Sequence, residues 1–200
     1  MNSLINLDQH VGNAFASHRT PVGIAIMRDI TALGGHTVLT MIVLFTIGFL
    51  VAVRRRRTAA FVLLAVLGGI FFTEALKFLT GRPRPFLEDD ELIAFRPDSP
   101  SFPSGHSALS AVVYLTIALL VAGRLEGRRI HVYLISWSLI LAFLVGVSRL
   151  YLGVHYFTDV VAGWAGGFLW AIACRWVEDH WLAVRERSVA VDEGVEAYSG

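Results

Sequence analysis

The sequence HTVLTMIVLFTIGFLVAV occupies residues 36–53, and no Asp, Glu, Lys or Arg lies between Asp29 and Arg54. A helix needs about 20 apolar residues, with a range of about 17–25, to cross the hydrocarbon core of a bilayer. Residues 36–53 satisfy both the length and the apolar character. We therefore predict a transmembrane helix here.

Four later stretches meet the same criterion. The five predicted spans are approximately His36–Val53, Thr58–Leu79, His106–Gly123, Ile130–Ser148 and Phe157–Trp176. The fold class that follows is all-α: an integral membrane helical bundle of about five transmembrane helices, with interfacial helices at the N-terminus.

The overall composition agrees with a membrane protein of one compact domain. Of the 200 residues, 55% are hydrophobic and 16% charged, against about 25% charged in soluble domains. This composition excludes a disordered chain. A single cysteine, Cys174, excludes an intrachain disulfide, and a formal net charge of +1 gives no general attraction to nucleic acid.

The first 33 residues contain no spanning stretch. Apolar residues recur there at steps of three and four: Leu4, Leu7, Val11 and Phe15. This pattern is typical of a helix lying in the membrane interface. We expect Pro21 to end that helix and Val22–Leu33 to form a second short helix; no signal-peptide pattern precedes them.

Arginines in alternate loops predict the topology. Ten of the 17 basic residues lie in 54–57, 124–129 and 175–187, on one side of the membrane if the spans alternate. The positive-inside rule makes that side cytoplasmic. We predict a multi-pass protein of the cell inner membrane with an interfacial segment (1–33), a membrane-spanning domain (34–184) and a cytoplasmic polar tail (185–200).

Three motifs lie on the opposite face, toward the periplasm or cell exterior. They are Lys77, six residues, then Arg84-Pro85; Pro103-Ser104-Gly105-His106; and Ser148-Arg149, five residues, His155, three residues, Asp159. Together they resemble the signature of the type-2 phosphatidic acid phosphatase superfamily. The resemblance covers roughly Glu74–Gly167, and every signature position agrees with the family pattern.

The residue chemistry fits a phosphate site independently of the resemblance. Lys77, Arg84 and Arg149 supply three positive charges for a phosphate dianion, with arginine offering a planar fork for two oxygens. Ser104 and Gly105 stand where a helix should start, so the hydroxyl and free N–H groups there can bind phosphate oxygens.

The histidines suggest the chemistry. His155 and Asp159 are four residues apart, the spacing of one helical face, so the carboxylate can hold one imidazole nitrogen while the other attacks phosphorus. The resemblance implies a phosphohistidine on His155 oriented by Asp159, with His106 protonating the leaving oxygen. No residue cluster suggests a metal site, and three fixed cations already supply the charge neutralisation, so we expect no metal ion or other cofactor.

The substrate expected from this resemblance is a lipid phosphate that enters from the bilayer. Undecaprenyl pyrophosphate, phosphatidylglycerophosphate and phosphatidic acid all fit, and the sequence does not choose among them, nor does it indicate an oligomeric state. A lipid phosphotransferase with the same intermediate and a non-enzymatic transporter are the alternatives; five spans disfavour a soluble haloperoxidase.

Several histidines, glycines and acidic residues outside the three motifs are interpreted as structural or surface residues. We assign the remaining histidines to the membrane interface or surface: His10, His18, His36, His131 and His180. Glu74 is expected to pair with Lys77 or to face a polar cavity. Gly163 and Gly167 are expected to allow close helix packing within the monomer, and the acidic run Glu88–Glu91 is interpreted as a solvated loop.

Overall fold

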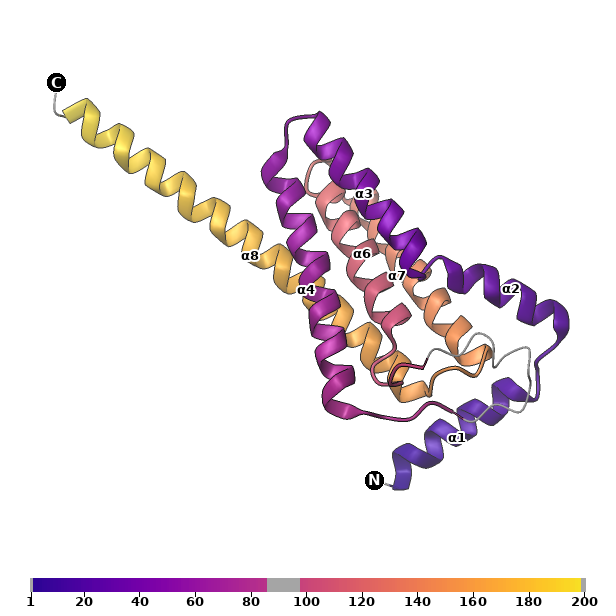
Figure 1. The fold of residues 1–200 in the computed structure, drawn as a ribbon. Helices are drawn as coiled ribbons and strands as arrows, with labels where there is room; N and C mark the ends of the chain where they lie inside the picture. The colour runs from indigo at the N-terminus through magenta and orange to yellow at the C-terminus, as the bar shows by residue number, and fades with distance from the viewer. Residues whose placement is uncertain (1, 86–97, 199–200) are drawn as a thin grey trace.

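The computed structural model describes the backbone of residues 2–85 and 98–198 and the side chains of residues 3–85 and 98–181. Within these ranges the regular structure is helical throughout, with no strand (Figure 1). The helices are α1 (Asn2–Ala16), α2 (Pro21–Ala32), α3 (His36–Ala52), α4 (Arg56–Thr80), α6 (Gly105–Ala122), α7 (Arg128–Tyr151) and α8 (Phe157–Tyr198). Among the described residues, five helical stretches are long and apolar enough to cross a membrane, which confirms the predicted fold class.

Helix α6 forms the centre of the bundle. It contacts α3, α4, α7 and α8, and most of its side chains are buried. Glycines on α8 permit the closest of these contacts: a Cβ on Gly163 would lie 2.7 Å from the Ser104 carbonyl oxygen, and one on Gly167 would collide with the Ala108 carbonyl oxygen. The prediction that this glycine pair packs helices within the monomer is confirmed.

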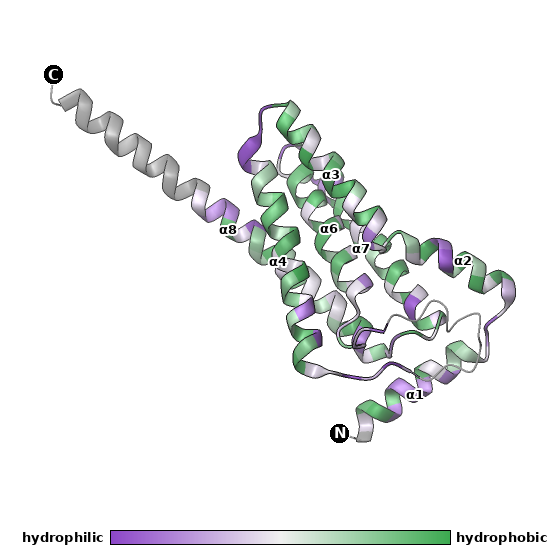
Figure 2. Ribbon diagram, viewed as in Figure 1, coloured by the Kyte–Doolittle hydropathy of each residue, from purple (hydrophilic) through white to green (hydrophobic). Residues whose placement is uncertain are grey.

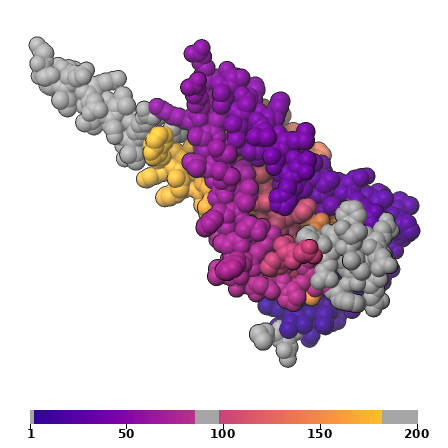
Figure 3. Space-filling model, in the orientation of Figure 1, coloured from indigo at the N-terminus to yellow at the C-terminus, as the bar shows by residue number. Residues whose placement is uncertain are grey.

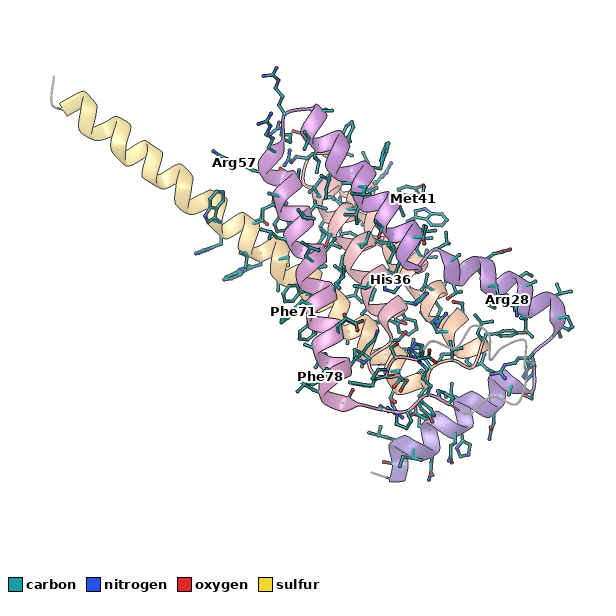
Figure 4. The ribbon with its side chains drawn as sticks, viewed as in Figure 1. Arg28, His36, Met41, Arg57, Phe71 and Phe78 are labelled. Carbon is teal, nitrogen blue, oxygen red and sulfur yellow. The ribbon has the colours of Figure 1, made fainter. Side chains whose placement is uncertain are left out.

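The outer surface of the bundle is apolar, as a bilayer requires. Hydrophobic residues cover α3, α4, α6 and α7 along their lengths (Figure 2). Phe71 and Phe78 are 75% and 87% exposed and point away from the other helices (Figure 4). In the space-filling view α3 and α4 lie side by side on one face of the molecule (Figure 3).

The N-terminal segment forms two helices, as expected, but their boundary differs from the prediction. Helix α1 ends at Ala16, and Pro21 begins α2 rather than ending α1. Thr20 is the N-cap of α2, its hydroxyl accepting a hydrogen bond from Gly23 N. Proline is tolerated at the first helical position because its missing N–H has no intrahelical partner there.

The last span is longer than predicted. Helix α8 continues without a break to Tyr198, beyond the end expected at Trp176, so the segment assigned as a polar tail is helical over most of its length and leads away from the bundle (Figure 1). The acidic run Glu88–Glu91 lies outside the described residues.

Candidate active site

The ends of α4, α6, α7 and α8 meet at one end of the bundle, next to α1 (Figure 1). Every residue predicted for the site lies there. Lys77 is in the last turn of α4, Arg149 in the last turn of α7, and Asp159 in the first turn of α8. Ser104 is the N-cap of α6, directly before Gly105 and His106. Arg84 and His155 lie in the connections that follow α4 and precede α8.

Lys77 packs against the start of α6. Its Nζ donates to Glu74 Oε1 at 2.7 Å, which confirms the predicted pairing. A Cβ added to Gly105 would lie 3.2 Å from Lys77 Nζ. Glycine at this position therefore leaves room for the ammonium group beside the N-terminus of α6, where a phosphate would meet both.

Arg84 is buried and holds the connections around the site together. Its guanidinium donates to the carbonyl oxygens of Ser99, Pro100 and Val154, and to Ser99 Oγ. Its Nη1 also lies 2.9 Å from His155 Nε2. Arginine can only donate, so the lone pair of His155 Nε2 accepts this bond, and the ring proton is on Nδ1.

Arg149 is the most deeply buried of the three cations, with 3% of its surface exposed. Nη1 donates to Thr31 Oγ1 of α2 at 3.1 Å, whereas its buried Nε has no hydrogen-bond partner among the described residues. Buried polar groups are nearly always satisfied. An unused guanidinium donor at this place favours an anionic ligand.

The start of α6 is fixed by Ser104 and Asp159. Ser104 is fully buried, its N–H donates to the Asp159 carbonyl oxygen at 3.0 Å, and its hydroxyl accepts from Ser107 Oγ at 2.9 Å. This ties the N-termini of α6 and α8 together, so the free N–H groups of α6 lie beside the His155–Asp159 pair.

His106 has an unexpected neighbour. The ring of His36 stands edge-on to it, with the ring centroids 6.1 Å apart, although sequence reasoning assigned His36 to the membrane interface. Arg149, His155 and Lys77 also lie within electrostatic range of His106. The signal for His36 was available: it opens a span on the same face as the three motifs.

His155 and Asp159 come together, but not on a helical face. His155 precedes α8, and His155 Nδ1 lies 3.4 Å from Asp159 Oδ2. The contact forms because the Asp159 carboxylate turns back at the helix start, where Oδ2 also accepts from Tyr156 N at 3.0 Å. The predicted partnership therefore exists, and the helical geometry given for it was wrong.

His155 is held in its neutral form. Its pKa is lowered from about 6.5 to about 4, chiefly because the ring is buried; the hydrogen bond with Asp159 acts in the opposite direction, and Arg149 and Arg84 lower the pKa further. With Nδ1–H directed to Asp159 and the lone pair on Nε2, the imidazole has the tautomer that a nucleophile needs.

Sequence reasoning missed Arg82 and Asp8. Arg82 donates to Asp159 Oδ1 at 2.6 Å and to Asp8 Oδ2 at 2.7 Å. Arg82 belongs to the run Gly-Arg-Pro-Arg-Pro, and Asp8 is the only Asp, Glu, Lys or Arg among the first 18 residues. A single carboxylate in an otherwise uncharged N-terminal segment was the feature of the sequence that could have identified Asp8.

Helix ends that gather three buried cations around a His–Asp pair, in a membrane bundle, define a phosphate-processing membrane enzyme. Comparison with known proteins agrees: the PAP2 superfamily model matches residues 58–182. The chain belongs to the PAP2 superfamily.

Relatives and solved structures cover most of the chain. Phosphatidylglycerophosphatase B of Bacillus subtilis (strain 168) is 34% identical over 84% of this chain and 81% of its own. Decaprenylphosphoryl-5-phosphoribose phosphatase of Mycobacterium tuberculosis is 32% identical over 74% and 76%. The crystal structure of a transmembrane PAP2-type phosphatidylglycerolphosphate phosphatase from Bacillus subtilis matches with a TM-score of 0.82 and 28% identity, covering 90% of this chain and 88% of the other. The protein is thus a multi-pass membrane phosphatase of a lipid phosphatase family.

Proposed function

We propose that the protein hydrolyses a phosphomonoester or pyrophosphate of a membrane lipid through a phosphohistidine on His155. The observation that carries this proposal is the state of His155: it is neutral and buried, with Nδ1 beside Asp159 and the Nε2 lone pair facing Arg84. A nucleophile needs an unprotonated nitrogen aimed at a site where cations neutralise phosphate charge; a phosphate that takes over the Arg84 hydrogen bond would leave the Nε2 lone pair available.

The reaction has two steps. Nε2 of His155 forms a bond to phosphorus while the bond to the leaving oxygen breaks, and His106 gives that oxygen a proton. Water then attacks the phosphohistidine, His106 takes the water proton, and the P–N bond breaks to release phosphate and restore His155. Asp159 keeps the Nδ1 proton in place through both steps.

Phosphate binding is assigned to the buried cations and the start of α6. Lys77, Arg84 and Arg149 neutralise the phosphate charge, and the Ser104 hydroxyl and Gly105 N–H bind its oxygens. Among the described residues, no three His, Cys, Asp or Glu side chains are grouped to hold a metal ion. Metal-independent turnover is part of the proposal because the three fixed cations supply the charge neutralisation that a metal ion would otherwise provide.

A lipid substrate is supported by the surroundings of the site. A cavity of about 180 Å³ between α3, α4 and α6 has His36 at one end and aliphatic side chains such as Leu39, Val66 and Val113 along its walls. His36 contacts His106, so a chain in this cavity lies next to the general acid. The large sequence overlap with phosphatidylglycerophosphatase B makes phosphatidylglycerophosphate the first substrate to test.

The deciding experiment is phosphate release by the purified full chain in detergent. Phosphatidylglycerophosphate, undecaprenyl pyrophosphate and phosphatidic acid are compared with and without a chelator. We expect release of inorganic phosphate and acid-labile phosphate on His155 after acid quenching. Phosphorylated lipid or sugar acceptors in place of inorganic phosphate would instead establish a phosphotransferase, and label on any other residue would refute the assignment of the nucleophile.

A further inference from the structure

Arg82 connects two buried carboxylates from distant parts of the chain. Its Nη1 donates to Asp159 Oδ1 and its Nη2 to Asp8 Oδ2. Asp159 is fully buried and Asp8 is 4% exposed. Buried carboxylates are costly unless a counter-charge and hydrogen bonds satisfy them. Arg82 supplies that counter-charge to both, and Asp8 and Asp159 raise the pKa of its guanidinium against the opposing effect of partial burial.

Asp8 of α1 also caps the first turn of α8. Its Oδ1 accepts from Thr158 N at 2.8 Å, and its Oδ2 accepts from Thr158 Oγ1 at 2.8 Å. The residue before α8 is Tyr156, whose side chain cannot act as an N-cap acceptor in the way that Ser, Thr, Asp or Asn does. Asp159 supplies the other half of a capping box by accepting from Tyr156 N. The start of α8 thus depends on a residue of α1.

These contacts decide where the Asp159 carboxylate points. Its contact with His155 Nδ1 is long, at 3.4 Å, whereas Arg82 and Tyr156 N bind it at 2.6 and 3.0 Å. The orientation of the carboxylate is therefore set by Arg82 and the helix start rather than by the histidine. A displaced carboxylate would leave the His155 ring without its orienting partner.

Helix α1 also forms a wall of the space next to His155. A cavity of about 260 Å³ is lined on one side by α1 residues, Asp8 and Gly12 among them, and on the other by His155 and Tyr156. The ring of Tyr156 lies under the Arg82 guanidinium, 4.2 Å from its Cζ to the ring centroid. Helix α1, which the sequence predicts to lie at the membrane interface, therefore also packs beside His155.

We propose that Arg82 and Asp8 are positioning residues for the reaction. They hold the Asp159 carboxylate in the orientation that contacts His155, so α1 contributes a residue on which catalysis depends. This inference rests on the proposed nucleophilic role of His155. It distinguishes Arg82 from Arg84, its neighbour in the same motif. The donors of Arg82 go to the Asp159 and Asp8 carboxylates and to Thr158 Oγ1, so its role is predicted to be orientation, with no direct share in phosphate binding.

The test compares Arg82→Gln and Asp8→Asn in the full chain with the exposed control variants Arg128→Gln and Asp29→Asn. Turnover of an aryl phosphate and of phosphatidylglycerophosphate, inhibition by vanadate, and thermal unfolding in detergent are measured. A misplaced catalytic group can cost on the order of 100-fold in rate, so we expect Arg82→Gln to lower kcat by about that factor. KM and the vanadate inhibition constant should stay within about twofold, because phosphate binding is retained.

A double-mutant cycle tests whether Arg82 acts through Asp159. In an Asp159→Asn background the further loss caused by Arg82→Gln should be close to absent, because the group that it positions has already been changed. Arg82→Lys should have a higher kcat than Arg82→Gln, because lysine keeps the positive charge. Its kcat should stay below that of the wild type, because lysine lacks the planar guanidinium that joins the two carboxylates. If Arg82→Gln does not fold, Asp8→Asn carries the test, with a smaller kcat loss and the same unchanged vanadate affinity.

Two results with Arg82→Gln would show that Arg82 does not act by positioning Asp159. One is a loss of vanadate affinity in Arg82→Gln as large as its loss of kcat, which would make Arg82 a phosphate ligand. The other is an undiminished effect of Arg82→Gln in the Asp159→Asn background. His155→Ala separates this failure from that of the proposed function: if His155→Ala is inactive while Arg82→Gln and Asp8→Asn turn over like the wild type, the positioning role alone is wrong.

Discussion

Arg84 donates through Nη1 to His155 Nε2 at a distance of 2.9 Å, so the nitrogen that we propose as the nucleophile is already paired with a cation that we propose binds phosphate. The same guanidinium is anchored to the carbonyl oxygens of Val154 and Ser99. A phosphate that takes over the Nη1 hydrogen bond would therefore place its phosphorus next to the Nε2 lone pair. In the proposed mechanism one arginine would thus both bind the anion and direct it at the histidine.

The first prediction concerns protonation of His155. Diethyl pyrocarbonate modifies only neutral imidazole, so its rate at His155, followed by peptide mass spectrometry between pH 4 and 8, should stay high down to the pKa of about 4. Arg84→Gln removes a positive charge that lowers this pKa, so the midpoint should move to higher pH. A wild-type midpoint near 6.5, the ordinary value for histidine, would contradict the buried neutral ring.

The second prediction concerns the packing of α8 on α6. Gly167→Ala places a Cβ against the Ala108 carbonyl oxygen, and overpacking of this kind costs about 1–3 kcal/mol of stability. We expect a lower unfolding temperature in detergent and reduced turnover, because the same helix carries Asp159. Gly48→Ala is the matched control: a Cβ at Gly48 meets nothing within 4 Å, so stability should be unchanged or slightly higher. Equal effects of the two substitutions would argue against the contact.

The third prediction concerns orientation in the membrane. In a Cys174→Ser background, Glu126→Cys should react with a membrane-impermeant thiol reagent only from the cytoplasmic side, and Asp98→Cys only from the outside. The reason is the concentration of arginine in the loops at the Glu126 end of the bundle, including Arg57, which lies at the opposite end of α4 from Phe78 (Figure 4). Labelling of Glu126→Cys from outside would reverse the topology.

The fourth prediction concerns metal ions. Turnover should survive chelation, because in the proposed mechanism Lys77, Arg84 and Arg149 neutralise the phosphate, and these cations would repel a divalent cation. Vanadate should inhibit, since its five-coordinate form resembles the transition state at phosphorus. Activity that is lost in chelator and restored by magnesium would rule out the mechanism as written.

The sequence predicted the spans and the site residues because both depend on local patterns. Apolar runs of membrane length identify helices directly, and Lys77, His106 and His155 stand in short motifs whose spacing is visible in one dimension. The contact of Asp8 with Thr158 and Arg82 links segments 150 and 74 residues apart, and no periodicity reports such a pairing. The position of Pro21 was misjudged for a related reason: a proline that ends one helix and one that begins the next look alike until the N-cap at Thr20 is known.

The last prediction separates the two histidines by the leaving group. His155→Ala should abolish turnover of every substrate, because no phosphohistidine can form. His106→Ala removes only the proton donor, and general acid catalysis contributes about 10²–10⁴-fold. The loss of turnover in His106→Ala should be large for a lipid phosphate, whose alkoxide leaves poorly. It should be small for an aryl phosphate, whose phenolate needs little protonation.

Labelling completes this test. Acid-quenched His106→Ala should still carry acid-labile phosphate when supplied with an aryl phosphate, because His155 and its partner Asp159 are intact. Asp159→Asn should bind vanadate like the wild type while its kcat falls strongly, since we propose that the carboxylate orients His155 and does not bind phosphate. Phosphate on His106, or substantial turnover by His155→Ala, would show that the roles of the two histidines are exchanged or shared.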